Sequence, residues 1–335
     1  MAHSNNSRDP RGPAAAVLGI GCAAVLCGAA LAQDGGRRVE RTETRETTTV
    51  QSGRLAWLRG ENERPILRYV TGEVPEGERA PSVEGTCFTH PLHTPSGAVV
   101  TDVGPADHPH HRGVFSAWVE VEGERTGDWW GWGAKAPKDG RRISNRALST
   151  RAGRGRASLR AENDWLAEDR PVLRETVAIT ARTVGVSNVI DYELRYAAPT
   201  KKPVVLAQNP FGGFCYRAKP RGKQLLTGPN GPATYRDSVF DKAETNWPSA
   251  GWYDLSYEMP DGTVNGVAVM SHPDNPASTW HVVRGIHMLN PCIVAAGPVT
   301  IQPGKPLVLR YRLVAHDGAA AAADLPALYR EFSKG

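Results

Sequence analysis

The sequence lacks the short motifs that identify several large enzyme classes. Its 335 residues contain no G-x-S-x-G nucleophile elbow, no Walker phosphate-binding loop, no G-x-G-x-x-G dinucleotide fingerprint and no H-E-x-x-H zinc motif. Each of these motifs supplies a specific piece of chemistry, such as a strained serine or a phosphate cradle. We therefore do not expect an α/β-hydrolase, a P-loop enzyme, a Rossmann dehydrogenase or a zincin.

Long apolar runs and massed charge are also missing from most of the chain. Beyond residue 32 no stretch is apolar enough to span a bilayer, so we expect no membrane span in the mature protein. Forty basic residues against 35 acidic ones give a net charge of +5, and these charges are spread along the chain. Without a basic arm or a recognisable nucleic-acid module, we expect no nucleic-acid partner.

The first 32 residues have the pattern of an export signal. Arg8 and Arg11 supply positive charge, a run of small apolar residues follows, and Ala30-Leu-Ala32 is an A-x-A cleavage site. We predict a signal peptide at 1–32, a polar lead-in at 33–52 and one domain at 53–335. The mature protein is then periplasmic or extracellular.

Cysteine is scarce in the predicted mature chain, which keeps Cys87, Cys215 and Cys292. With three cysteines at most one disulfide can form. The interpretation we favour is that all three are small buried hydrophobic residues.

Strand patterns dominate the predicted domain, which is rich in turn-forming Gly and Pro. Residues 217–255 are expected to be mostly loop. A single helix is predicted at 324–333, capped by Asp324. This content predicts an all-β fold, a large antiparallel β-sandwich of two curved sheets. The strands are expected at 53–58, 65–70, 114–121, 173–180, 188–196, 204–207, 264–270 and 307–314.

Five of the ten histidines fall within residues 90–113, a stretch too rich in Pro and Gly to be a helix. Histidine titrates near neutral pH and is the commonest metal ligand, so a cluster on loops indicates proton transfer or metal binding. The alternative is that some of these rings only hold the loops together. The histidines are His90, His93, His108, His110 and His111.

The segment DHPHHRG at 107–113 is the predicted centre of the site. His108 and His110 have the i, i+2 spacing that places two rings on one side of an extended chain, as a bound divalent metal ion would require. We expect His108, His110 and His111 to be catalytic, Arg112 to bind a hydroxyl or oxyanion, and Asp107 to orient a ring. A cupin would need a glutamate a few residues after the histidines, and the next residues are Arg112, Gly113, Val114 and Phe115, so the motif does not fit.

A second histidine stretch, HPDNPASTWH at 272–281, follows a predicted strand. We expect His272 and His281 to bind substrate beside His90 and His93, and Asp274 to act as an acid–base or orienting group. The alternative is an Asx-turn at Asp274 capped by His272. Both stretches form one site only if their loops meet at the same end of the sandwich.

Nine tryptophans are many for this length, and three lie in the glycine-rich loop at 127–133. Flat aromatic faces suit the C–H faces of sugar rings, so Trp129, Trp130 and Trp132 are predicted substrate-binding residues. The alternative is packing in the core.

Together the two histidine stretches, and the segment LRYRLVAHDG at 309–318, resemble the PmoA-like family of exported bacterial proteins. The resemblance covers roughly residues 53–333. The inherited label "methane oxygenase" is judged wrong, because the methane monooxygenase subunit has many membrane-spanning helices. Members are described as domains of unknown function linked with sugar catabolism. The resemblance also implies a fold similar to the galactose-mutarotase-like supersandwich.

We therefore expect an exported carbohydrate-active enzyme that acts on a small-molecule or oligosaccharide ligand by histidine acid–base chemistry. Epimerisation, elimination and hydrolysis of a sugar derivative all stay open, with or without a divalent metal ion. The alternatives are a non-catalytic sugar-binding module and an envelope scaffold. The sequence does not decide the oligomeric state.

Overall fold

The computed structural model describes residues 48–52, 55–60, 63–72, 87–133, 140–234, 248–283 and 285–335. They belong to one compact unit, Thr44–Gly335. The predicted signal peptide at 1–32 and most of the lead-in lie outside the described residues, so these boundaries stay predictions. No helix in the described part of the chain is long and apolar enough to cross a membrane.

One of the two large sheets carries the segments on either side of the first histidine stretch. Its strands are antiparallel, and its strand order is β1 (Thr48–Ser52), β2 (Leu55–Arg59), β3 (Pro65–Val70), β4 (Phe88–Leu92), β5 (Val114–Ala117), β12 (Gly213–Arg217), β18 (Met288–Cys292) and β17 (Thr279–His281). The first five strands are neighbours in sequence order, whereas β12, which lies between β5 and β18, comes from a distant part of the sequence on both sides.

The second large sheet is built mainly of long hairpins. Its antiparallel order is β14 (Gly231–Pro232), β13 (Lys223–Gly228), β15 (Trp252–Glu258), β16 (Val264–Ser271), β20 (Leu307–Asp317), β10 (Ser187–Ala197), β9 (Arg170–Val184), β8 (Arg156–Ala167) and β7 (Arg141–Gly153). A small third sheet contains β19 (Val299–Ile301), β11 (Val204–Leu206) and β6 (Val121–Glu122).

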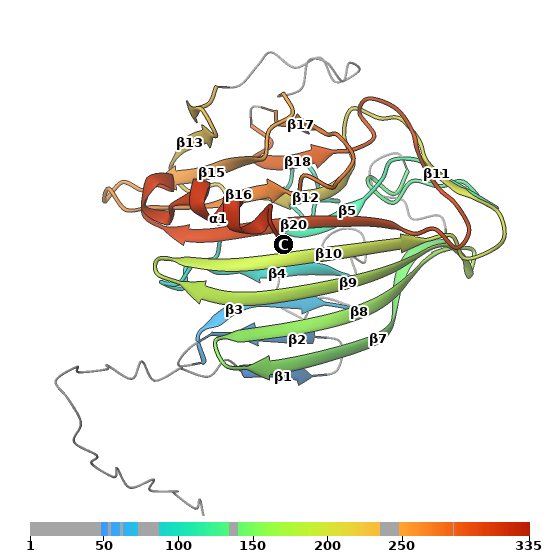
Figure 1. The fold of residues 1–335 in the computed structure, drawn as a ribbon, viewed down its shortest axis with the longest axis horizontal. Helices are drawn as coiled ribbons and strands as arrows, with labels where there is room; N and C mark the ends of the chain where they lie inside the picture. The colour runs from blue at the N-terminus through green and yellow to red at the C-terminus, as the bar shows by residue number, and fades with distance from the viewer. Residues whose placement is uncertain are drawn as a thin grey trace, which may run out of the picture. The chain divides into compact units, whose positions relative to one another are not determined.

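The two large sheets pack face to face, with β7 to β10 layered over β1 to β4 (Figure 1). Phe214 of β12 stacks on Tyr311 of β20 with ring centroids 4.3 Å apart. Tyr192 of β10 reaches across to Thr89 of β4 with a 2.9 Å hydrogen bond between hydroxyl oxygens. These contacts confirm the predicted all-β antiparallel sandwich.

The C-terminal helix α1 (Leu325–Phe332) follows a short 3-10 turn, η3 (Ala320–Ala323). The side chain of Asp324 accepts a hydrogen bond from the backbone N–H of Ala327, as predicted for the cap. Leu325, Leu328 and Phe332 are buried in a second apolar cluster on the outer face of the nine-stranded sheet. Figure 1 shows α1 lying against β16 and β20.

The strand prediction is incomplete. The described part of residues 217–255, expected to be mostly loop, contains β13, β14 and the start of β15. Several strands were also not predicted, among them β4, β7, β12, β17, β18 and β19. Strand β7 is an edge strand whose residues are mostly exposed, so it lacks a continuous apolar face. The three cysteines are buried as expected, and Cys215 and Cys292 are free thiols.

Candidate functional site

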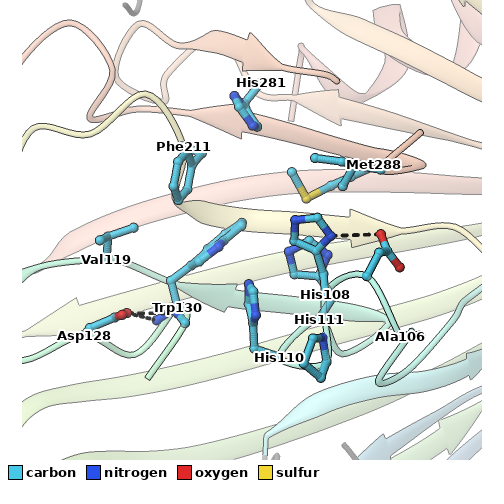
Figure 2. A pocket seen from close by; sticks show the side chains of 14 residues that line it. Ala106, His108, His110, His111, Val119, Asp128, Trp130, Phe211, His281 and Met288 are labelled. Carbon is cyan, nitrogen blue, oxygen red and sulfur yellow. Dashed lines mark hydrogen bonds and ion pairs between the residues drawn. The ribbon is translucent and has the colours of Figure 1, made fainter. Parts of the chain in front are cut away.

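A cavity of about 590 Å³ opens beside the first histidine stretch, within the size range of ligand pockets. Four histidines lie around it in Figure 2. It lies where β5, β12, β17 and β18 meet, and three separate regions of the chain contribute to its walls. The lining consists of residues 106–111, Val119, Asp128, Trp130, Gly131, Phe211, His281, Ile286 and Met288.

The histidine loop, residues 104–111, is closed by an antiparallel bridge between Val103 and Arg112. Inside it, the backbone N–H of His111 donates to the carbonyl of His108 over 3.0 Å. Gly113 then leads the chain into β5 with a φ of +60°, and a Cβ there would lie 2.3 Å from the carbonyl oxygen of Thr89. Only glycine fits, because both the left-handed backbone and the close approach exclude a side chain.

The pocket lies on the outer face of the eight-stranded sheet. Side chains alternate along β5, so Ser116, which accepts a hydrogen bond from Tyr196 of the other sheet, points inward and Phe115 points outward. In the register of β12 and β18, Arg217 pairs with Met288. The pocket therefore lies against the outer face of this sheet, away from the core of the sandwich, with His281 and Met288 on its strands and most other lining residues on loops.

Arg217, Asp107 and His108 form a chain of charge-assisted hydrogen bonds at the pocket. One terminal nitrogen of Arg217 donates to both carboxylate oxygens of Asp107, at 3.0 Å each. The Nδ1 of His108 lies 2.8 Å from Asp107 Oδ2. Since an ionised carboxylate only accepts, Nδ1 of His108 carries a proton, and Nε2 is the basic nitrogen of the neutral ring.

The carboxylate of Asp107 stays ionised in this setting. Partial burial raises its pKa, but the hydrogen bonds from His108 and Arg217 outweigh that effect, and the pKa lies below its usual value. The side chain of His108 is 31% exposed, whereas that of Arg217 is 2% exposed. A buried guanidinium thus fixes a carboxylate, which fixes a solvent-accessible imidazole.

The other three histidines of the pocket are held neutral. Burial, followed by the charges of His108 and Arg112, lowers the pKa of His110 to about 4. Burial and then His108 lower the pKa of His281 to about 4. The pKa of His111 is lowered well below its usual value by burial and by its neighbours His110 and Arg217.

The hydrogen-bond roles of these rings differ. A terminal nitrogen of Arg217 lies 3.3 Å from His111 Nδ1, which must accept because a guanidinium only donates. Neutral His111 therefore carries its proton on Nε2. The Nδ1 of His110 is buried with no hydrogen-bond partner, which costs free energy. The rings of His108 and His111 are stacked, with centroids 4.7 Å apart.

An aromatic wall continues the pocket from the histidine loop, since the ring of Trp130 lies 5.7 Å from that of His111. Trp130 lies 5.5 Å from Phe211, and Phe211 lies 5.1 Å from His281, measured between ring centroids. Asp128 holds Trp130 in place, because its carboxylate accepts from the backbone N–H groups of Trp130, Gly131 and Gly133. Figure 2 shows Trp130 and Phe211 side by side below His281.

The structure brings together six of the thirteen predicted site residues: His108, His110, His111, Asp107, Trp130 and His281. Arg112 does not line the pocket. Its guanidinium is buried between the rings of Phe115 and Trp132, 4.7 and 5.0 Å from their centroids, and donates to the carbonyl of His110. Arg112 therefore supports the loop from behind and is not placed to bind a hydroxyl.

Trp129 and Trp132 are fully buried, as the packing alternative stated. Near-complete burial in the core leaves their rings no face for a ligand. His90 lines a different cavity with Asp102 and Lys219, and the Nδ1 of His93 lies 3.1 Å from the carbonyl of Gly97.

His272 and Asp274 also lie outside the pocket. The ring of His272 packs on Phe332 of α1, with centroids 5.1 Å apart, and its Nδ1 accepts from the backbone N–H of Asp274. The carboxylate of Asp274 is 76% exposed and lies 3.6 Å from Arg310. His272 therefore caps a turn, as that part of the alternative stated, but Asp274 does not form the Asx-turn, because Pro276 has no N–H to donate. Strand β16 lies between β15 and β20 in the nine-stranded sheet and not beside β5.

In the described ranges, no group of three or more His, Cys, Asp or Glu side chains is placed to hold a metal ion. His108 and His110, the predicted ligand pair, have ring centroids 5.6 Å apart. The two rings are edge to face, and the Nδ1 of His108 is already engaged by Asp107. The described residues therefore do not present a ready metal site.

Sequence reasoning missed Arg217, Asp128, Phe211 and Met288. The signal for Asp128 was present, since an aspartate before a glycine-rich loop commonly accepts from the following backbone N–H groups. Nothing local indicated Arg217, which stands 110 positions from Asp107 at the end of β12.

The sequence matches the model of a protein family over residues 60–330, and that family is described as a family of unknown function (DUF6807). This agrees with the predicted domain of unknown function, whereas nothing in the match supports the name PmoA. A search of curated proteins found no match.

Among solved structures, the chain is similar to two GH36 α-galactosidases of Geobacillus stearothermophilus, AgaA in complex with stachyose and AgaB. Both have 12% sequence identity and a TM-score of 0.41, and the alignments cover 83% and 84% of this chain but 41% of each of those. It is also similar to the Slr1438 protein of Synechocystis sp. PCC 6803, with 10% identity and a TM-score of 0.35, over 81% of this chain and 96% of that one. The chain thus spans less than half the length of the α-galactosidases, and similarity at this distance identifies no activity.

Proposed function

Because the chain belongs to a family of unknown function (DUF6807), its activity has to be inferred from its own pocket, and we propose an exported carbohydrate-active enzyme with His108 as acid–base catalyst. The observation that carries this proposal is the chain from Arg217 through Asp107 to His108. An imidazole oriented by a carboxylate, with its other nitrogen unblocked, is the usual arrangement of a general base. A histidine that only held the loop would not need this support.

The rest of the pocket supports a polar, ring-shaped ligand. The aromatic wall of Trp130 and Phe211 offers flat surfaces for the C–H face of a pyranose. The neutral rings of His110, His111 and His281 supply hydrogen-bond donors and acceptors for hydroxyl groups. The cavity of about 590 Å³ holds one or two sugar residues by size.

In this proposal His108 Nε2 takes a proton from a C–H or O–H group of the sugar. Asp107 stabilises the imidazolium that forms, and Arg217 keeps the carboxylate ionised and in place. In an epimerisation, a donor on the opposite face of the carbon supplies a new proton while His108 gives the abstracted one to solvent. In an elimination, the proton passes to the leaving oxygen as the C–O bond breaks. In a hydrolysis, His108 instead takes the proton of an attacking water, and a proton goes to the leaving oxygen.

A proton-exchange experiment tests the proposal. The protein from residue 33 onward is incubated in D₂O with a panel of aldoses, methyl glycosides and sugar acids, and followed by proton NMR. Loss of a C–H signal reports proton abstraction, and new epimer, alkene or anomeric signals identify the reaction. We expect conversion of at least one sugar, and its loss in His108→Asn, where the amide nitrogen can still donate to Asp107.

The matched control is His272→Asn, whose amide oxygen can replace the acceptor nitrogen of a histidine outside the pocket. Equal conversion by wild type and His108→Asn would overturn the catalytic role.

The competing function is a sugar-binding module without catalysis, which the aromatic wall alone favours. In that case a sugar perturbs the fluorescence of Trp130, binding survives His108→Asn, and no signal exchanges. An envelope scaffold would show neither binding nor exchange. Export is tested separately, since N-terminal sequencing of the mature protein should begin near Gln33.

A further inference from the structure

Arg217 holds two different side chains of the pocket at once. One of its terminal nitrogens donates to both carboxylate oxygens of Asp107 at 3.0 Å, and the other lies 3.3 Å from the Nδ1 of His111. A guanidinium has only donors, so each partner must present an acceptor to it. A single side chain therefore constrains both Asp107 and His111.

The position of Arg217 is itself fixed by the segments that flank the histidine loop. Its backbone N–H donates to the carbonyl of Gly113 over 2.8 Å, and its carbonyl accepts from the N–H of Asp102 over 3.1 Å. Its side chain is 2% exposed. The guanidinium thus stays in place while the pocket is empty or filled.

The contacts of Arg217 give two histidines opposite tautomers. Asp107 accepts from the Nδ1 of His108 over 2.8 Å, so the Nε2 of His108 is an acceptor. His111 accepts at its Nδ1 and carries its proton on Nε2, and burial, followed by the charges of its neighbours, lowers its pKa so that the ring stays neutral. His108 therefore offers a base, and His111 offers an N–H donor.

The base and the donor face the same side of the pocket. The rings of His108 and His111, which both line the cavity, are stacked with centroids 4.7 Å and planes 17° apart. Figure 2 shows them next to each other at one end of the pocket. Each ring turns its Nδ1 toward the ion pair of Arg217 and Asp107, so each Nε2, on the opposite edge of its ring, points away from that ion pair. The two Nε2 groups can therefore reach neighbouring atoms of one ligand.

We infer that Arg217 sets this base–donor pair, and that the pair acts on sugars with a carbonyl group next to the C–H bond that breaks. This inference rests on the proposed function and names its substrate class. His108 Nε2 takes the proton, and the C–H electron pair forms a C=C bond. The carbonyl electron pair moves to its oxygen, which accepts a hydrogen bond from the Nε2–H of His111. The enolate then takes a proton back at carbon.

A neutral imidazole suits an enolate better than a leaving group. It donates a hydrogen bond to a developing oxyanion without giving up its proton. Protonation of a leaving oxygen would turn His111 into an imidazolate, and a neutral imidazole is a far weaker acid than an imidazolium. The expected substrate is therefore an open-chain aldose or a keto sugar, and not a glycoside, in which the carbonyl carbon is locked.

Matched sugars with and without a free carbonyl test the substrate class by proton exchange in D₂O. Each set contains an aldose, the corresponding ketose and the methyl glycoside, for example glucose, fructose and methyl glucoside. We expect deuterium at the carbon beside the carbonyl of an aldose or ketose, and none in the glycoside. His111→Phe keeps a flat ring and removes the donor, so it should lower the exchange rate by about 10²- to 10³-fold.

The outcomes separate this inference from the proposed function. Conversion of glycosides alone, or equal exchange rates for wild type and His111→Phe, overturns the inference and leaves His108 as the base. Conversion of no sugar overturns the proposed function as well.

The role of Arg217 is tested by NMR of protein with ¹⁵N-labelled histidine rings. Wild type should show the proton of His108 on Nδ1 and that of His111 on Nε2. Arg217→Lys keeps the charge and loses the two-pronged donor, so His111 should populate both tautomers. The control is Arg312→Lys, which changes another buried arginine–aspartate pair on the other sheet and should leave both rings unchanged.

A proton on the Nδ1 of His111 in the wild type, or unchanged tautomers in Arg217→Lys, overturns the role of Arg217. Circular dichroism shows whether the variants fold, and the wild-type tautomers decide by themselves if Arg217→Lys does not.

Discussion

The two large sheets hold buried histidines in opposite electrostatic settings. His316 of β20 is 0% exposed, and its two ring nitrogens face Asp254 and the carbonyl of Gly318 at 2.9 and 3.0 Å. Burial lowers the pKa of His316, but Asp254 and Gly318 outweigh burial, and the pKa is raised. His110 and His281, beside the eight-stranded sheet, are nearly as buried and have pKa values of about 4.

The pKa values of these histidines differ because their hydrogen-bond partners differ, and not because their burial differs. His316 has an acceptor for each N–H, so it is satisfied as a cation and belongs to the framework. His110 lines the cavity, and its buried Nδ1 has no hydrogen-bond partner. A buried imidazole without its full set of partners, at a pocket, is therefore the better sign of ligand binding than histidine content alone.

The largest expected effect separates His108 from His272. His108→Asn should lower turnover of the sugar found by NMR by about 10²- to 10⁴-fold, since general base catalysis contributes that much. His272→Asn should leave turnover unchanged. Steady-state kinetics measure both, and a comparable loss in the two variants would place a functional role on the nine-stranded sheet as well.

Acid should destabilise the protein through the pocket histidines. The pKa of His110 is about 4 in the folded state and near 6.5 in the unfolded state. As pH falls from 6.5 toward 4, the unfolded state takes up the proton first, so the free energy of unfolding decreases by up to roughly 3 kcal/mol for this ring. Urea unfolding at several pH values in this range measures the decrease. The free energy of unfolding of His110→Asn should depend less steeply on pH than that of the wild type, and an equal dependence would mean that His110 is not held neutral.

Trp130→Leu should weaken sugar binding by about tenfold, because one stacking surface is lost. The ring of Trp130 also lies 5.7 Å from that of His111, so its removal should admit water and move the pKa of His111 back toward its usual value. Trp57→Leu is the control, on β2 of the same sheet and away from the pocket. Isothermal titration and NMR titration read out the two effects, and unchanged affinity would remove Trp130 from the site.

The smallest expected effect is the contribution of His316 to the pH dependence of stability. Its raised pKa means that its contribution to stability is fully present below pH 6.5 and is lost as pH rises through the folded value. The sign is opposite to that of His110. NMR titration should show His316 still protonated at a pH where His110 and His281 are neutral, and a His316 that titrates with them would erase the contrast between the sheets.

Much of the fold could be predicted from local pattern. The second half of strand β10 alternates between buried and more exposed residues, and that alternation is visible in the sequence as Tyr192, Leu194 and Tyr196 on one face. Strand β7 could not be found in this way, because an exposed edge strand has no apolar face to alternate. A strand can be recognised from the sequence when one of its faces is buried and therefore apolar.

The candidate site also contains residues that local sequence could predict and residues that it could not. His108, His110 and His111 are contiguous, so their clustering is a local property that the sequence already contains. Whether His272 or His281 lies at the pocket depends on which sheet the strand carrying or preceding it joins. Strand β16 pairs with β15 and β20, whereas β17 pairs with β18. Arg217 depends on the same long-range pairing. Strand partners are decided by the whole core, and a single motif does not contain them.

The carboxylate of Asp128, with its three backbone N–H groups, has a consequence for the speed and cost of ligand capture. The segment carrying Trp130 gives up its conformational freedom when the chain folds, not when a ligand arrives. Ordering a flexible side chain on association costs about 0.5–1.5 kcal/mol, and here that loss of entropy is already complete. The aromatic surface should therefore meet its ligand as a preformed wall, with association limited by diffusion and desolvation and not by loop closure.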